Sequence, residues 1–171
     1  MHLIVERLST PIGAVLITHD GNVICNTEFE DSEERRAQEL AQHFPGAAFT
    51  RAKKRSPFGE ALTRYFDGDV RAIDKVPIAD IGTPFQQRAW NELRKIPPGQ
   101  TRGYGEQAAR LGNPSAARAV GRANGQNPNA IIVPCHRLVG ADGSFVHYGG
   151  GLERKRWLID HEARHAGRAR T

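Results

Sequence analysis

The chain has 171 residues, of which 39% are apolar and 25% are charged, as in globular proteins of one domain or two small ones. It contains no apolar run near the roughly 20 residues that a membrane helix needs and no signal-peptide pattern, so a cytoplasmic location without a membrane partner is expected. Its two cysteines and seven scattered histidines form neither a disulfide framework nor a recurring metal-ligand spacing, so no metal or other cofactor is expected.

Charge is distributed unevenly along the chain. Residues 1–85 contain 10 Lys and Arg against 13 Asp and Glu, a net of −3, whereas residues 86–171 contain 14 against 6, a net of +8. The basic second half predicts contact with a polyanion, although a basic face is about as often merely solvated.

The first half predicts a mixture of strands and helices. The turn Asp20-Gly21-Asn22 separates two apolar stretches and predicts a hairpin. Ser32 is the expected cap of one helix, and Ser56-Pro57 is the expected start of another. The expected elements are strands at 3–8, 14–18 and 23–29, helices at 32–43 and 56–66, and a linker at 70–82.

The second half predicts a helical arrangement. Thr83-Pro84 has the cap-and-proline pattern of a helix start, and Pro97-Pro98-Gly99 ends that helix. Two short helices are expected at 104–111 and 115–124, separated by a tight turn at Gly112-Asn113-Pro114. Two short helices around such a turn are typical of a helix-turn-helix.

The expected helix at 115–124 has an unusual composition. Its side chains are mostly small, and Arg118 and Arg122 share one face at i, i+4. Small residues let a helix backbone approach another surface closely, and the arginines add long, positively charged side chains. Alone, this composition also fits a packed core helix with two solvated arginines. Beside a helix-turn-helix in the basic half it favours DNA binding.

An apolar segment from Ile131 to Pro134 predicts a buried strand that ends with Cys135 beside His136. A thiol is nucleophilic only as the thiolate, so it needs a neighbouring base or positive charge. A core cysteine is the alternative interpretation and the commoner fate of a single cysteine. Neighbouring residues on a strand point to opposite faces, so the Cys-His adjacency alone does not decide between the two.

The last helix supplies a third candidate. Glu162 falls on the same stripe as Lys155 and Leu158, at a position where a carboxylate is costly unless it is paired. His136 is a candidate partner, which would give a Cys–His–Glu relay. The alternative is that Glu162 lies at a frayed helix end and bonds to solvent or to Arg164.

A glycine run precedes this helix. In Tyr148-Gly149-Gly150-Gly151 the glycines allow the backbone to approach a ligand closely, and the tyrosine ring offers a flat wall. A plain flexible turn would have much the same composition.

These motifs together resemble the O6-alkylguanine-DNA alkyltransferase family, also called methylated-DNA–protein-cysteine methyltransferases. The resemblance spans residues 83–162 and continues more weakly before them, and the layout is similar to the constitutive bacterial type. The motifs that carry it are Phe85-Gln86-Gln87 with Trp90, Ile96-Pro97 with Gly99, Tyr104-Gly105, Arg118-Ala119-Val120-Gly121, Asn127-Pro128, Pro134-Cys135-His136-Arg137, Tyr148 with Gly150, Lys155 and Glu162.

The resemblance implies an α+β fold of two domains. An RNase H-like α/β domain is expected over residues 1–80, followed by a mainly helical winged helix-turn-helix domain over residues 81–171. The implied activity is DNA repair by single-use transfer of an alkyl group from O6-alkylguanine to the protein's own cysteine. The implied partner is double-stranded DNA, bound from the minor groove with little sequence specificity and with the damaged base flipped out.

The resemblance also implies roles for the catalytic residues. Cys135 would accept the alkyl group after activation by His136, through a water, and by Glu162. Asn127 would brace the turn that carries the thiol. Tyr104 would hydrogen-bond the flipped base and help the guanine leave.

Further residues would hold the substrate. Arg118 would fill the gap in the duplex, the backbone near Leu138 would read the base's amino group, and the Gly149 N–H would face O6. The full set expected at the substrate or the DNA is Arg118, Ala119, Arg122, Leu138, Tyr148, Gly149 and Lys155. The protein is expected to be a monomer, with cooperative binding on DNA left open.

The sequence departs from the family pattern at Gly103, His147 and Gly149, which affects the expected width of the pocket and its preference among alkyl groups. Whether O4-alkylthymine is also repaired is left open. Two other functions fit the sequence less well. A non-enzymatic lesion-binding protein of the alkyltransferase-like kind would lack the thiol of Cys135, and a cysteine hydrolase would have no use for a helix-turn-helix.

Overall fold

The computed structural model describes residues 1–168, which form two compact units. The first comprises Met1–Ile81 and Pro128–Ile132, and the second comprises Gly82–Asn127 and Val133–Gly167. The first break lies one residue from the expected boundary, but the return of residues 128–132 to the first unit was not predicted. No helix among residues 1–168 is both long and apolar enough to cross a membrane.

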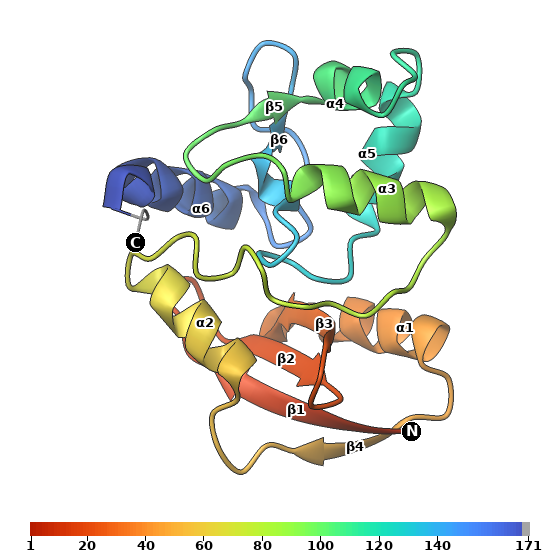
Figure 1. Cartoon of the computed structure of the whole chain (residues 1–171), viewed down its shortest axis with the longest axis vertical. Coiled ribbons are helices and arrows are strands. Elements are labelled where there is room, and N and C mark those ends of the chain that lie inside the picture. Colours follow the sequence, from red (N-terminus) through yellow and green to blue (C-terminus); the bar gives the residue numbers. More distant parts are fainter. Residues whose placement is uncertain (169–171) are drawn as a thin grey trace. The chain divides into compact units, whose positions relative to one another are not determined.

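The first unit is built on a four-stranded sheet (Figure 1). The strand order is β3-β2-β1-β4, in which β1 to β3 are antiparallel and β4 runs parallel to β1. The short edge strand β4 was not predicted, because its partner lies about forty residues earlier in the chain and no local hairpin marks it. The strands are β1 (His2–Leu8), β2 (Val15–His19), β3 (Ile24–Phe29) and β4 (Ala48–Arg51).

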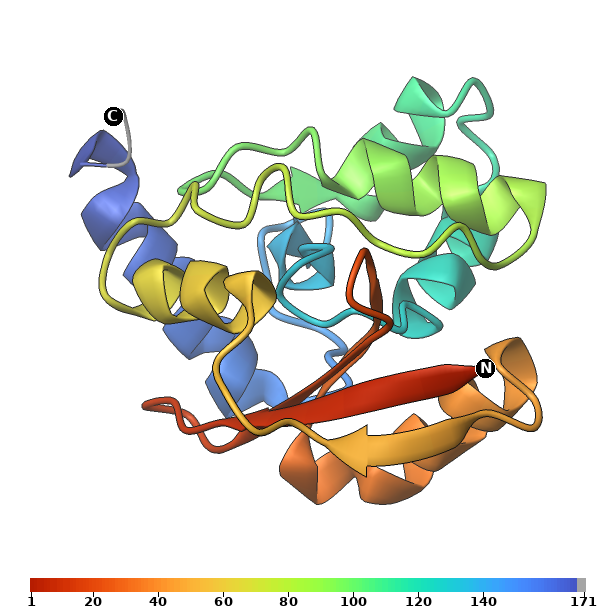
Figure 2. The same cartoon turned by 60° about the horizontal axis from the view of Figure 1, so that its bottom comes forward.

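Two helices of this unit lie on opposite faces of the sheet (Figure 2). Helix α1 (Glu33–His43) packs Leu40 against Leu3 and Cys25. Helix α2 (Pro57–Phe66) begins with Ser56 as its cap, and the Ser56 hydroxyl accepts the Gly59 N–H. The expected side-chain cap at Ser32 is wrong, because the chain enters α1 through a 3₁₀ turn, η1 (Glu30–Ser32), and the Ser32 side chain accepts no capping hydrogen bond.

The stretch expected to be a linker is part of the first unit. Val70, Ile73 and Val76 are buried, and Pro77 accepts the Ile24 N–H at 2.9 Å. Irregular backbone therefore completes this core, which periodicity in the sequence does not reveal.

The second unit contains the expected helix-turn-helix. Thr83 and Gln86 form a reciprocal capping box at the start of the first helix. The turn between α4 and α5 passes through Gly112, whose φ is 85°. The parallel strands β5 and β6 pair beside these helices, and residues 140–144 form a turn after β6. The elements are α3 (Pro84–Leu93), β5 (Arg102–Gly103), α4 (Tyr104–Arg110), α5 (Ala117–Gly125), 3₁₀ turn η2 (Cys135–Arg137), β6 (Leu138–Val139), α6 (Leu152–His165) and 3₁₀ turn η3 (Ala166–Arg168).

The strand expected before Cys135 is wrong. Residues 130–133 form successive turns, and Ile131 adopts a φ of 72°. Ile131, Ile132 and Val133 are buried all the same. A short apolar run therefore signalled burial and not extended backbone.

Candidate active site

The thiol of Cys135 lies at the start of a tight buried turn. Cys135, His136 and Arg137 form η2, and all three side chains are buried. A 3₁₀ turn advances each residue by about a third of a revolution. Successive side chains therefore need not alternate between two faces, as they would on the expected strand.

Glu162 is the centre of a buried hydrogen-bonded cluster. Its Oε2 lies 2.8 Å from His136 Nε2 and 2.9 Å from the Arg137 terminal nitrogen Nη2, and its Oε1 lies 2.8 Å from Arg137 Nε. The Arg137 side chain also donates to the Ile96 carbonyl at 2.6 Å. Glu162 is only 1% exposed, so its charge is compensated by neighbours and not by water.

The charge states follow from this geometry. Burial alone would raise the pKa of Glu162, but the hydrogen bonds from His136 and Arg137 and the positive charge of Arg137 hold it well below its usual value. Burial lowers the pKa of His136, which keeps the imidazole neutral. A carboxylate only accepts hydrogen bonds, so Nε2 of His136 carries the proton and Nδ1 keeps its lone pair. Nδ1 is buried and has no hydrogen-bond partner among residues 1–168.

Arg137 was not among the residues predicted for the site. The sequence predicted only His136 as a partner for Glu162. A buried carboxylate beside a neutral imidazole still needs a full positive charge nearby. Arg137 follows His136 directly and supplies that charge through a fork of two nitrogens. The signal was present in the sequence as a cation next to the predicted relay.

Two asparagines hold the backbone around the thiol. Asn127 is buried, and its side-chain amide donates to the Val133 carbonyl at 2.9 Å. Asn124, in the last turn of α5, donates to the carbonyl of Cys135 itself at 3.3 Å. Asn127 thus lies where a brace was predicted, whereas the link from Asn124 was missed.

Two ionisable side chains lie close enough to interact electrostatically with Cys135. Burial raises the pKa of Tyr104, a negative charge on Cys135 would raise it further, and a hydrogen bond with Asn124 opposes both. The Lys155 ammonium is buried and donates to the carbonyls of Leu138 at 2.6 Å and His147 at 3.1 Å. Burial lowers the pKa of Lys155, while negative charge on Cys135 acts the other way.

The glycine-rich segment lies next to this cluster. The Tyr148 ring meets the His136 ring edge to face at a centroid distance of 6.4 Å. Gly149 is exposed, and Leu138 is fully buried in β6. Of the positions expected to hold a base, the ring of Tyr148 is thus in contact with His136.

The predicted recognition helix presents its charges outward. Arg118, Ala119 and Arg122 are all exposed on α5. Gly121 faces Tyr104, since a Cβ built there would lie 3.8 Å from the ring. One helix therefore carries an exposed basic surface and also contacts the surroundings of the thiol.

The other cysteine has a different environment. Cys25 is a free thiol in the core of the first unit, and burial raises its pKa to about 11. Such a thiol is inert at neutral pH. Within residues 1–168, no three His, Cys, Asp or Glu side chains gather closely enough to hold a metal ion.

Comparison with known proteins identifies the family. Residues 84–164 match the model of the 6-O-methylguanine DNA methyltransferase DNA-binding domain. A methylated-DNA–protein-cysteine methyltransferase of Shigella flexneri is 42% identical over 165 residues, which cover 95% of this chain and 96% of that protein. The chain belongs to the methylated-DNA–protein-cysteine methyltransferase family.

Solved structures support this assignment. The structure of Mycobacterium tuberculosis OGT in complex with DNA matches with a TM-score of 0.74 and 35% identity, covering 97% of this chain and 95% of that one. An O6-methylguanine-DNA methyltransferase from Pyrococcus kodakaraensis shares the fold, with a TM-score of 0.64 at 24% identity. The predicted family and α+β fold are confirmed.

Membership establishes the reaction. This methyltransferase repairs DNA by direct transfer of an alkyl group from O6-alkylguanine to one of its own cysteines. DNA is its substrate and partner. The two alternative functions, a lesion-binding protein without a thiol and a hydrolase, do not fit this family.

Proposed function

We propose that Cys135 is the alkyl acceptor of this methyltransferase and that His136 and Glu162 activate it. The observation that carries the proposal is the orientation of His136. Its Nε2 is held 2.8 Å from the buried Glu162 carboxylate, which leaves the Nδ1 lone pair as the base beside the thiol's turn. The other cysteine, Cys25, lies in the core of the first unit and has a raised pKa.

The transfer is a single displacement. His136 Nδ1 takes the thiol proton, directly or through one water, and Glu162 stabilises the imidazolium that forms. The Cys135 thiolate attacks the alkyl carbon, a new S–C bond forms, and the C–O6 bond breaks with its electrons going to the guanine. The proton taken up by His136 returns through water to the base and completes guanine, and the Tyr104 hydroxyl would donate a hydrogen bond to that base. The thioether has no leaving route, so each molecule acts once.

Arg137 acts as a positioning residue in this scheme. It occupies both oxygens of Glu162 and carries a permanent positive charge, so the carboxylate stays ionised and its orientation is fixed. Glu162 then stabilises the imidazolium without taking its proton.

We infer that the damaged base reaches this site after extrusion from the duplex, because chemistry at O6 is impossible inside the stack. Helix α5 would enter the minor groove, where the small side chain of Ala119 permits close approach. Arg118 would replace the extruded base, and Arg122 would meet a phosphate. The protein would bind as a monomer.

The pocket for the base would be formed by the loop before α6. Tyr148 would provide its wall, the Gly149 N–H would face O6, and the backbone near Leu138 would read the amino group. Lys155 is fully buried and bonded to two carbonyls. We therefore expect it to order this loop and not to bind phosphate.

Mass spectrometry tests the acceptor directly. After incubation with an excess of O6-methylguanine duplex, we expect the protein to gain one methyl group, in the tryptic peptide that contains Cys135, and then to stop. Cys25→Ala should behave like the wild type, and Cys135→Ser should bind DNA without transfer. Methyl on Cys25, or continued turnover, would refute the assignment.

A further inference from the structure

The first unit has an apolar sheet face that its helix covers incompletely. Leu3 is fully buried beneath Leu40 of α1, but Val5 and Leu16 on the same face are only half buried. Leu40 is the only residue of α1 classed as buried. Since α1 offers no second large apolar side chain over Val5 and Leu16, the sheet is left open there.

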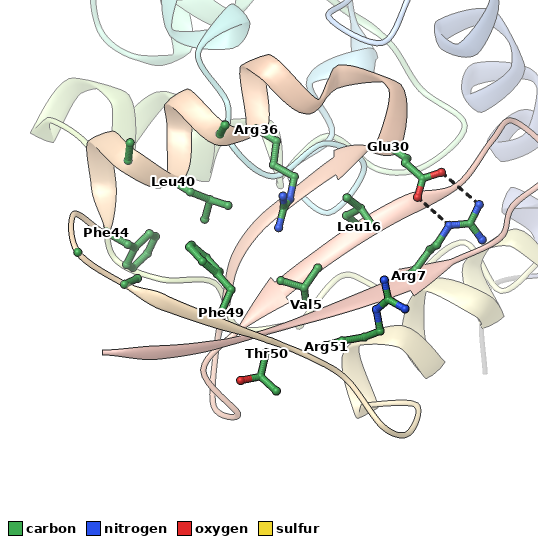
Figure 3. Close-up of a pocket in the computed structure, with 14 residues that line it drawn as sticks. Val5, Arg7, Leu16, Glu30, Arg36, Leu40, Phe44, Phe49, Thr50 and Arg51 are labelled. Atoms are coloured by element: carbon green, nitrogen blue, oxygen red, sulfur yellow. Dashed lines mark hydrogen bonds and ion pairs between the residues drawn. The ribbon is translucent and has the colours of Figure 1, made fainter.

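The uncovered face forms a groove of about 750 Å³ (Figure 3). Val5 and Leu16 lie at its base, α1 forms one wall, and β4 forms the other. Phe49 of β4 lines the groove and is 48% exposed. An apolar surface of this kind beside a sheet edge is typical of an interaction site.

The groove carries unbalanced positive charge. Arg7, Arg36 and Arg51 line it, together with a single carboxylate, Glu30. Glu30 is already bound by Arg7 through two hydrogen bonds of 2.7 and 3.1 Å. Within residues 1–168, neither Arg36 nor Arg51 forms an ion pair, and Nε of Arg36 is buried without a hydrogen-bond partner. Arg36 Nη2 donates to the Thr18 hydroxyl at 3.1 Å, so the remaining donors of Arg36 and the guanidinium of Arg51, one from each wall, are the positive groups available to an anionic ligand.

The β4 wall is also an open sheet edge. β4 lies last in the strand order and pairs only with β1. The N–H groups of Ala48 and Ala52 donate to the carbonyls of Met1 and Val5, at 2.9 and 2.8 Å. Backbone groups alternate along a strand, so those of Phe49 and Arg51 point to the open edge. The two residues whose side chains line the groove thus also offer unpaired backbone to a further strand.

We propose that this groove binds an extended acidic peptide of a partner protein, which pairs with the edge of β4, inserts an apolar side chain over Val5 and Leu16, and places carboxylates on Arg36 and Arg51. A backbone edge combined with alternate side-chain pockets is the arrangement used for β-strand addition. A small amphipathic anion would satisfy the arginines but not the edge of β4. The site is independent of the alkyl-transfer chemistry.

The test uses the full chain and a labelled synthetic peptide, acetyl-Glu-Thr-Leu-Thr-Glu-amide, whose alternate residues match the groove. We expect amide chemical-shift changes centred on Phe49 and Arg51 and saturable binding by fluorescence anisotropy. Arg36→Glu combined with Arg51→Glu should weaken binding at least tenfold. The matched control, Arg64→Glu with Arg71→Glu, reverses two exposed arginines of the same unit that are paired with aspartates, and it should change binding less than twofold.

Two further arms make the test decisive. The same peptide N-methylated at all its backbone amides has no N–H group to donate to β4 in either direction of pairing and should not bind. If the double groove variant fails to fold, as judged by its methyl-transfer rate, the exposed Arg51→Glu alone should still weaken binding severalfold. The proposal is overturned if both double variants weaken binding equally, if the N-methylated peptide binds as well, or if only laurate, an amphipathic anion without a backbone, occupies the groove.

Discussion

Replacing Glu162 with glutamine tests the buried cluster most sharply. The substitution keeps the shape of the side chain but removes its charge and places an NH₂ group against a donor of His136 or Arg137. Three hydrogen bonds of 2.8 to 2.9 Å are affected. Since Arg137 stays charged and buried, we expect the free energy of unfolding to fall by about 3–5 kcal/mol.

The same change should slow alkyl transfer by about 10²–10⁴-fold, the usual contribution of a general base. The assay is single-turnover transfer from an O6-methylguanine duplex with protein in excess, on samples shown by urea titration to be folded. Thiol alkylation by iodoacetamide as a function of pH gives a second readout, because a purely structural role for Glu162 would leave the pKa of the Cys135 thiol unchanged.

Glu153→Gln is a matched control, since it makes the same change at an exposed position in the first turn of α6. It should leave both the rate and the unfolding free energy near wild type. A folded Glu162→Gln protein that transfers at the wild-type rate across neutral pH would show that the relay is wrong.

Three further predictions follow from the site and the first unit. Arg118→Ala should slow repair of duplex DNA but spare transfer from free O6-benzylguanine, and equal losses of rate on both substrates would place Arg118 in the pocket. Arg122→Ala should weaken DNA binding and flatten its salt dependence by about one unit of slope. Asn124→Ala loses its hydrogen bonds to the Cys135 carbonyl and to Tyr104, so both substrates should react about 5- to 30-fold more slowly, as expected for about 1–2 kcal/mol. Burial, reinforced by a neighbouring carboxyl, raises the pKa of Glu28 to about 9. Because the pKa of Glu28 is higher in the folded than in the unfolded protein, its contribution to the free energy of unfolding is complete at low pH. This contribution is lost as the pH rises from about 4.5 toward 9, by up to about 1.4 kcal/mol per pH unit. Urea titrations at neutral and alkaline pH should show this loss in the wild type and not in Glu28→Gln.

Much of the second unit was predictable because its signals are local. The capping box at Thr83 and the turn at Gly112 are set by neighbouring residues, and the structure has both. The inward position of Glu162 followed from helical spacing, which is why its burial could be predicted before its partner was known.

The features that were missed depend on distant contacts. β4 forms only by pairing with β1, and Val70, Ile73 and Val76 are buried in irregular backbone that the surrounding core holds in place. The apolar run at 131–133 signalled burial correctly, but the positive φ of Ile131 is imposed by tertiary structure. Arg137 was overlooked because the charge it balances lies 25 residues away on another helix.

The return of residues 128–132 to the first unit has a consequence for biosynthesis. Thr27 donates to the Pro128 carbonyl at 3.0 Å and accepts the Ala130 N–H at 2.9 Å, so the edge of β3 is completed by residues about a hundred positions later. Contacts of such separation form late in folding. At about 5–20 residues per second, the ribosome needs several seconds to add residues 82–128. During that time the nascent chain exposes an unpaired strand edge, and a fragment that stops at residue 81 would keep it permanently.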